Sequence, residues 1–405
     1  MRFEIFAAKR LIKSKNSGYT SYIIRIALVA VTLCVAVMLV SLGVLTGFKD
    51  AVREKISGFG SHMQAVRFTA YGAYSDSPMK ADNAVIEQVQ NLKQVKNVTP
   101  VLYESGVIIN DNTFHAVLLK GITSSFDTSF FHSSLTSGCM PQYSNEGGQQ
   151  ILISQNIADK LNINVSDRIK VQFFTDAMMR SKRFTVSGIY QTGLSDYDER
   201  FLICQSAVLE NIFSLDSGAC TCYEITLKDF SMLESGADAV YAALPQDMTV
   251  QTVRQAEPNL FSWLDLLDSN VVLIIVIMFL VTVVTLSGVT LILIFEKKKT
   301  VGILKTMGVK NSIIMRIFLI RIGWLAFVGT AAGNVLALVL ELIEKYTDVI
   351  KLDPQSYYLT SVPVTINVFH YLVLDIAVLA VCVLCMVIPA RSINKISIVK
   401  NLRFE

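Results

Sequence analysis

Residues 26–48 read IALVAVTLCVAVMLVSLGVLTGF and contain no charged side chain. A helix of about 20 apolar residues covers the roughly 30 Å of hydrocarbon in a lipid bilayer, so this stretch predicts a membrane span at 22–47. A second uncharged run predicts another span at 269–295. The first run is too long, begins too late and lacks a small-residue cleavage site for a signal peptide, so we expect it to stay in the membrane.

Two weaker apolar stretches predict two further spans. The stretch 313–343 contains Arg316 and Arg321, but both lie near its start, where long basic side chains reach the membrane interface. The stretch 366–389 contains Asp375, for which solvation or a hydrogen bond to another span is favoured over a proton relay. The predicted fold is an α-helical membrane protein with four transmembrane helices plus a large α+β extracytoplasmic domain, 48–268, inserted between the first and second helices.

Composition agrees with a membrane protein and excludes a cytosolic globular enzyme. The chain of 405 residues is 52% hydrophobic and 17% charged, with a mean hydropathy of +0.48. The net charge of +3 hides an asymmetry, because residues 49–268 hold 17 Lys and Arg against 25 Asp and Glu. The acidic block and the basic remainder therefore face different compartments.

Basic residues beside the spans predict the orientation, because loops rich in Lys and Arg stay in the cytoplasm. Such residues precede the first span, separate the second from the third and follow the fourth: Lys9, Arg10, Lys13, Lys15, Lys297, Lys298, Lys299, Lys305, Lys310, Arg391, Lys395, Lys400 and Arg403. The termini, 1–21 and 390–405, and the loop 296–312 are predicted to be cytoplasmic. The domain 48–268 and the loop 344–365 are predicted to lie on the opposite side of the membrane.

The external block combines period-2 runs with short amphipathic stretches, which is typical of an α+β domain. The predicted strands are Met63–Phe68, Phe114–Lys120, Arg168–Phe174, Phe184–Tyr190 and Tyr223–Leu227, and the predicted helices are Asp82–Leu92, Ser154–Leu161, Ser206–Ile212 and Ser231–Ala243. A division into two lobes is expected near Gly121. Cys139, Cys204, Cys220 and Cys222 lie in this block, and both disulfides and buried thiols are left open.

No motif for bond-breaking chemistry is found. The chain has no phosphate-binding loop, and Gly43–Lys49 (GVLTGFK) has the wrong spacing for one. Ser77 and Lys80 match a Ser-x-x-Lys pattern without its partner motifs. The four histidines (His62, His115, His132, His370) are scattered, and Cys382 and Cys385 favour apolar packing over a metal site. We expect no catalytic residue, no bound metal or cofactor and no nucleic-acid partner.

Several segments resemble one transporter family. EKKKTVGILKTMGVKNSII (296–314), PAR (389–391) and NLRFE (401–405) are similar to widely shared permease motifs. FTVSGIYQTGLSDYDERFLIC (184–204), ILISQNIADKLNINVSDRIKV (151–171), LDPQSYYLTSVPVTI (352–366) and VLTGFKDAVREKISG (44–58) are similar to motifs of one branch. Together they resemble the permease subunits of lipoprotein-releasing ABC transporters (LolC/LolE type), within the wider MacB/FtsX-like permease family.

The resemblance implies an inner-membrane protein with a periplasmic domain, which takes part in transport driven by a separate ATPase subunit. The expected partners are two copies of an ABC ATPase, which hold ATP and Mg, a second permease of the same or a sister chain, membrane lipid and a lipoprotein substrate. A periplasmic lipoprotein carrier is left open as a partner, because the family's carrier-recruiting member has a long Pro-containing hook. The connection 175–183 (TDAMMRSKR) is short and lacks Pro.

The loop 296–312 is the first candidate site. Apolar residues at helical spacing among lysines predict a short helix along the inner surface: Val301, Ile303, Leu304, Met307 and Val309. Gly302 and Gly308 weaken a free-standing membrane anchor and suit close approach by a partner. The resemblance implies a coupling helix seated in the ATPase, with contacts from Val301, Gly302, Ile303, Leu304, Lys305, Thr306, Met307 and Gly308. Simple contact with anionic lipid is the alternative.

The first span carries the second and third candidate sites. Gly43 and Gly47 form a small-residue face that lets another helix approach closely. The resemblance implies an apolar cavity open to the outer leaflet, and the expected lining residues are Met38, Leu42, Leu45, Phe48, Val272, Ile275 and Phe279. The implied function is extraction of lipoproteins from the inner membrane. A macrolide or peptide exporter and a non-transporting regulator of cell-wall hydrolases are the alternatives.

Overall fold

The computed structural model describes residues 18–68, 78–110, 113–141, 148–174 and 179–390, which form two compact units. The helical unit takes its described residues from 18–49, 263–350 and 361–390, and the mixed unit comprises the described residues of 50–262 and 351–360. Some predictions fall on residues outside the described ranges: the basic residues at 9–15, Ser77, residues 175–178 of the short connection 175–183, and the tail 391–405.

Long helices dominate the helical unit. They are α2 (Gly18–Gly60), α10 (Pro258–Glu296), α12 (Asn311–Thr347) and α14 (Val368–Ala390), with the short α11 (Lys298–Thr306) between α10 and α12. Three of them, α2, α10 and α12, are long and apolar enough to cross a membrane, and α14 contributes a shorter apolar stretch, Val368–Leu384. At about 1.5 Å per residue, the 43 residues of α2 extend roughly 65 Å, about twice the thickness of the hydrocarbon layer.

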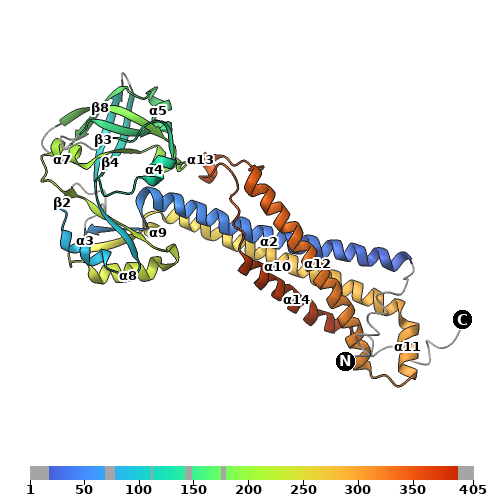
Figure 1. Cartoon of the computed structure of the whole chain (residues 1–405). Coiled ribbons are helices and arrows are strands. Elements are labelled where there is room, and N and C mark those ends of the chain that lie inside the picture. The colour runs from blue at the N-terminus through green and yellow to red at the C-terminus, as the bar shows by residue number, and fades with distance from the viewer. Residues whose placement is uncertain (1–17, 69–77, 111–112, 142–147, 175–178, 391–405) are drawn as a thin grey trace. The chain divides into compact units, whose positions relative to one another are not determined.

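One apolar core holds the helical unit together. It contains Val31 and Val35 of α2, Ile322 and Ala326 of α12, and Val378 of α14. The helices α12 and α14 lie side by side (Figure 1). Burying each large aliphatic side chain among its neighbours contributes on the order of 1.5–3 kcal/mol relative to water.

The mixed unit is built on a ten-stranded sheet in the order β12-β1-β11-β3-β4-β9-β6-β8-β5, with β7 pairing with β3 and β8. These strands are β1 (Met63–Arg67), β3 (Val95–Asn110), β4 (Thr113–Ile122), β5 (Leu135–Gly138), β6 (Gln150–Ser154), β7 (Arg168–Phe174), β8 (Met179–Tyr190), β9 (Phe201–Gln205), β11 (Cys222–Leu227) and β12 (Met248–Thr252). A small second sheet pairs β2 (Met79–Lys80) with β10 (Ala219–Cys220). The helices are α3 (Asn83–Gln90), α4 (Ser129–Ser133), α5 (Gln155–Leu161), α6 (Ser195–Asp198), α7 (Ser206–Phe213), α8 (Leu233–Ala243), α9 (Val253–Ala256), α13 (Pro354–Tyr357) and the 3-10 helix η2 (Phe230–Met232).

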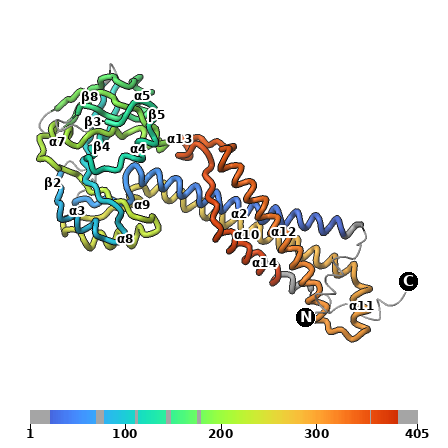
Figure 2. The backbone as a smooth tube through the Cα atoms, in the orientation of Figure 1, coloured from blue at the N-terminus to red at the C-terminus, as the bar shows by residue number. Residues whose placement is uncertain are grey.

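Strand β3 joins two lobes. Its first part, from Val95 to Val101, pairs with β11, and its second part, from Leu102 to Asn110, pairs with β4. The first lobe comprises β1, β11, β12, α3 and α8, and the second comprises β4 to β9 with α5 and α7. Figure 2 shows α3 and α8 together at one end of this unit, and α5 and β8 at the other. The predicted break near Gly121 is wrong, because Gly121 lies inside β4 opposite Leu102. The polar residues that follow Gly121 belong to a loop before α4.

The predicted elements of this unit are confirmed, within a few residues at their ends. Arg168–Phe174 is β7, and the other four predicted strands are β1, β4, β8 and β11. The predicted helices are α3, α5, α7 and α8, the last preceded by η2. The hydroxyl of Ser154 accepts a hydrogen bond from Ile157 N at 3.1 Å, as expected of a helix cap.

The four cysteines of this unit are unbridged thiols, and for three of them the structure agrees with the alternative of buried thiols. Cys204, Cys220 and Cys222 are buried, and Cys139 is exposed. Burial raises the pKa of Cys204 and that of Cys220, the latter to about 12. These buried thiols are therefore protonated and act as small apolar side chains.

Candidate functional site

The loop between α10 and α12 forms α11, whose end is defined by hydrogen bonds. Gly308 N donates to Lys305 O at 3.0 Å and Val309 N donates to Leu304 O at 3.1 Å, the pattern of a Schellman motif. Gly308 adopts a φ of +82°, which favours glycine, and no heavy atom lies within 4 Å of an added Cβ. Gly308 thus ends the helix, and its close approach by a partner stays a prediction.

The apolar stripe of α11 divides between two faces. Val301, only 1% exposed, joins the core of the helical unit, and Leu304 packs partly against it. Gly302 is also buried. Ile303 and Met307 point outward, and Met307 is 74% exposed. One turn apart on the helix, these two side chains form an exposed apolar pair beside Thr306 and Lys299. Of the eight predicted contact residues, Ile303, Thr306, Met307 and Gly308 are the exposed ones.

The seven predicted cavity residues do not share one surface in this chain. Met38 is fully buried in the core of the helical unit, and Leu42, Ile275 and Phe279 are partly buried against that core. Phe48 is buried with its ring 5.5 Å from that of Trp263. Leu45 is half-buried, and Val272 is 60% exposed. On α10, exposed apolar side chains continue along the helix from Val272 through Val276 and Leu280 to Val284.

Gly43 and Gly47 lie where other parts of the chain come close to α2. A Cβ on Gly43 would lie 2.5 Å from Oε1 of Glu341 on α12, and one on Gly47 would lie 2.5 Å from the carbonyl oxygen of Pro363. In addition, Thr365 N donates to Gly43 O at 3.1 Å. The small residues of α2 thus make room both for a helix and for the segment that leads to α14.

A second small-residue pair, on α12, is not among the sequence predictions. Gly329 and Gly333 pack against Val31 and Val35 of α2, and the Thr32 hydroxyl donates to Gly329 O at 3.3 Å. The signal was present as a Gly-x-x-x-Gly pattern in an apolar segment, which lets two helix backbones approach closely.

Replacing Gly333 with Leu is expected to destabilise the helical unit by about 1–3 kcal/mol, because the added atoms overfill a packed interface. The new Cβ would lie 2.7 Å from the Cβ of Val35. Thermal unfolding of the purified chain in detergent measures the effect. Gly323→Leu, on the same helix with no heavy atom within 4 Å of its Cβ, is the control. An equal loss in both variants would contradict the close contact.

Polar pairs also link α12 with α14. Asn334 Nδ2 donates to Asp375 Oδ2 at 2.7 Å, and the Tyr371 hydroxyl donates to Glu341 Oε2 at 2.6 Å. Asp375 therefore makes a hydrogen bond to another helix, the structural alternative favoured by the sequence. Such bonds stabilise helix pairs in a bilayer by roughly 0.5–2 kcal/mol each.

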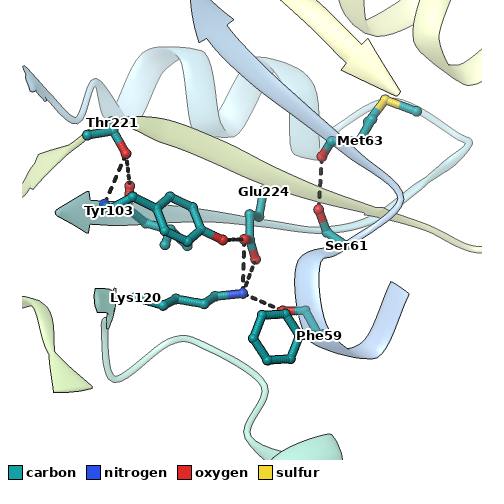
Figure 3. Close-up of polar contacts among 8 residues, drawn as sticks. Phe59, Ser61, Met63, Tyr103, Lys120, Thr221 and Glu224 are labelled. Carbon is teal, nitrogen blue, oxygen red and sulfur yellow. Dashed lines mark hydrogen bonds and ion pairs between the residues drawn. The ribbon is translucent and has the colours of Figure 1, made fainter. Parts of the chain in front are cut away.

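The C-terminal end of α2 is bound by a buried ion pair, which we call the α2 anchor (Phe59, Tyr103, Lys120 and Glu224). Lys120 Nζ lies 2.9 Å from Glu224 Oε1 and also donates to the carbonyl oxygen of Phe59, while the Tyr103 hydroxyl donates to the same carboxylate (Figure 3). The Lys120 side chain is 0% exposed and that of Glu224 is 3% exposed. Lys120 thereby satisfies a carbonyl at the end of α2 that has no partner within the helix.

The α2 anchor connects three strands to one helix. Tyr103 is on β3, Lys120 on β4 of the second lobe, and Glu224 on β11 of the first lobe. Burial, together with the nearby charge of Glu224, raises the pKa of the Cys222 thiol on the same strand. A pair of charges so completely removed from water requires both partners, because either one alone would be an uncompensated buried charge.

A second contact of α2 involves the segment QTGLSDYD (191–198). Lys55 Nζ donates to Thr192 O at 2.6 Å and to Tyr358 O at 2.9 Å. Asp198 shapes this turn by accepting from the Thr192 hydroxyl at 2.7 Å and from Gly193 N at 3.0 Å. Burial raises the pKa of Asp198 although these donors oppose the shift. These hydrogen bonds to Asp198 stabilise the turn that presents the Thr192 carbonyl oxygen to Lys55 of α2.

Two family models match successive parts of the chain. The MacB-like periplasmic core domain matches residues 26–258, which is more than half of the chain. The FtsX-like permease C-terminal model matches residues 272–398, which include α11 and α12.

Curated relatives match nearly the full length. The lipoprotein-releasing system transmembrane protein LolC of Xylella fastidiosa is 22% identical over 407 residues, covering 96% of each chain. LolC of Neisseria meningitidis is 20% identical over 412 residues, again covering 96% of each. LolE of Haemophilus influenzae is 20% identical over 410 residues, covering 95% of this chain and 94% of the relative.

Among solved structures, the periplasmic region of MacB from Actinobacillus actinomycetemcomitans is similar with a TM-score of 0.35 and 13% identity. That likeness covers 51% of this chain and 95% of the other. The extracellular domain of the transporter YknZ from Gram-positive bacteria has a TM-score of 0.31 at 13% identity, covering 47% and 99% of the two chains.

Proposed function

We propose, from the premise that this chain belongs to the LolC/LolE-type family of ABC transporter permeases, that it extracts lipoproteins from the outer leaflet of the inner membrane for transfer toward the outer membrane. As in that family, the chain is a permease and the ATPase is a separate subunit. The observation that carries the proposal is similarity over 96% of the chain to proteins named for lipoprotein release.

In the proposed topology α14 is the fourth span, both termini are cytoplasmic and the mixed unit is periplasmic. The basic loop around α11 and the acidic block 49–268 support this orientation. Two ATPase subunits would hold ATP and Mg and would contact α11, chiefly at Ile303 and Met307. A second permease, the same chain or a sister chain, would complete the transporter.

The proposed substrate cavity would form between two permeases, against the exposed apolar face of α10. This face includes Val272, with Ile275 and Phe279 beside it. Leu42, Leu45 and Phe48 of α2 remain proposed lining residues. Met38 is fully buried in the core of the helical unit, so it would line the cavity only if the helices around it moved apart. Acyl chains require apolar walls, and each covered side chain contributes on the order of 1.5–3 kcal/mol.

The α2 anchor and the Lys55 contact support a mechanical role for α2. Both fix the C-terminal part of this helix to the mixed unit through buried or charge-assisted hydrogen bonds. In the proposed cycle, closure of the ATPase subunits would move the spans, and α2 would carry that motion into the mixed unit.

The test is release of a lipoprotein by the reconstituted complex. The full chain is purified with its co-expressed neighbours, the bound proteins are identified, and the complex is placed in proteoliposomes with a triacylated lipoprotein. We expect an ATPase to co-purify and ATP to release the lipoprotein. Because the MacB-like model covers residues 26–258, efflux of a macrolide or peptide is the second candidate and is measured in parallel. A cell-wall hydrolase as the bound partner, without release, would overturn the proposal.

A further inference from the structure

A cavity of about 340 Å³ lies within the helical unit, between the beginning of α2, the end of α10 and the first half of α12. Its walls include Ile24 and Leu28 of α2, Leu293 of α10, and Trp324 of α12. Two basic residues, Arg25 and Arg321, also line it. The cavity is distinct from the exposed pair of α11 and from the proposed substrate-binding face of α10.

Arg321 is the unusual member of this set. The residue is 7% exposed, and its Nη1 atom is buried with no hydrogen-bond partner among the described residues. None of the described lining residues is acidic. Glu296 attracts the guanidinium electrostatically, but its carboxylate is 3.2 Å from Lys297 Nζ. A buried cation with an unused donor is costly, so the site favours an anion that accepts from it.

The remaining walls favour a ligand with a long apolar part. Ile24, Leu28, Leu293 and Trp324 supply aliphatic and aromatic surface, and the Trp324 ring stacks on Phe327 at 5.8 Å between centroids. Trp side chains are enriched where the hydrocarbon layer meets the headgroups. A guanidinium pair suits a phosphate group, because its N–H groups match phosphate oxygens in a bidentate geometry.

We propose that this cavity binds one anionic phospholipid of the inner leaflet. The headgroup phosphate accepts hydrogen bonds from Arg321 and from Arg25, and the acyl chains lie against Ile24, Leu28 and Trp324. Basic pockets between membrane helices on the cytoplasmic side are a recognised type of anionic-lipid site. The inference rests on the proposed cytoplasmic orientation of the loop between α10 and α12, and it does not depend on lipoprotein release.

The experiment uses the full chain in its purified complex, without ATP or lipoprotein, so that failure of lipid binding and failure of transport are distinguished. Native mass spectrometry measures retention of phosphatidylglycerol and of phosphatidylcholine, supplied at equal concentration. We expect one retained phosphatidylglycerol with a preference of at least about tenfold. Both lipids carry a phosphate, but the choline cation of phosphatidylcholine is repelled by the two arginines, so the preference should be lost in Arg321→Gln.

Matched variants separate the effect of the two cavity arginines from the effect of removing a positive charge elsewhere on the chain. Arg316→Gln removes the same charge from the same helix outside the cavity and is expected to keep the preference. Arg25→Gln is the second variant of the site and is used if Arg321→Gln fails to fold, as judged by thermal unfolding in neutral detergent. Equal retention of the two lipids, or an unchanged preference in both site variants, would overturn the proposal. So would displacement of the lipid by excess inorganic phosphate, which would identify a phosphate site without a lipid requirement.

Discussion

Replacing Lys120 with Met is expected to destabilise the mixed unit by about 3–5 kcal/mol, one of the largest single-residue effects in this chain. The substitution leaves the buried Glu224 carboxylate with the Tyr103 hydroxyl as its hydrogen-bond donor in the α2 anchor, and it leaves the Phe59 carbonyl at the end of α2 without the lysine. Thermal unfolding of the full chain in detergent should show a fall of roughly 10 °C in the transition of this unit.

Two comparisons make the Lys120 prediction specific. Lys170→Met, on the exposed side of β7, also removes a lysine and is expected to change stability by less than about 0.5 kcal/mol. Lys120→Met combined with Glu224→Leu should recover much of the lost stability, because removing both buried charges is often neutral. If the double variant were as unstable as the sum of the single variants, the ion pair would not be the source of the effect.

Placing Asp at both Ile303 and Met307 is expected to weaken binding of the ATPase by at least about 30-fold and to abolish ATP-driven lipoprotein release. Two exposed apolar contacts of a short helix are lost, each contributing on the order of 1–2 kcal/mol, and carboxylates replace them. Co-purification of the ATPase and release from proteoliposomes measure the two effects.

Controls within the same loop separate docking from folding. Ser312→Asp adds a carboxylate at an exposed position at the start of α12 and should leave binding unchanged. Leu304→Glu, the change that sequence alone would suggest, is expected to lower thermal stability, because Leu304 packs on the core of the chain itself. Normal release by the double variant with intact ATPase binding would contradict the role of α11.

Much of the fold could be predicted from the sequence, because local patterns of apolar and polar residues indicate where many of the helices and strands lie. Alternation of apolar residues located β7, the hydroxyl of Ser154 located the start of α5, and uncharged runs located α2 and α10. The sequence did not predict β3 as a strand, since Pro100 lies in its middle and lacks an N–H group for the sheet. The boundary between the lobes was misplaced at Gly121 for the same reason. The two lobes divide within β3, the strand that was not predicted.

The candidate sites were harder to predict, because composition does not reveal which face of an apolar helix is covered. Val301 and Met307 are both apolar at helical spacing, yet one is buried and the other is exposed. Met38 and Val272 differ in the same way. The α2 anchor has no local signature at all, because Lys120 meets Glu224 only after strands distant in sequence have paired.

The uninterrupted course of α2 through residues 18–60 constrains the evolution of its length. Each residue turns an α-helix by about 100°, so Val35, which faces Gly333 of α12, and Gly47, which faces Pro363, keep a fixed angular phase. Insertion or deletion of one residue between them would rotate one contact surface away from its partners. Length variation here should therefore occur in steps that restore the phase, such as about seven residues or two turns, while sequence varies more freely.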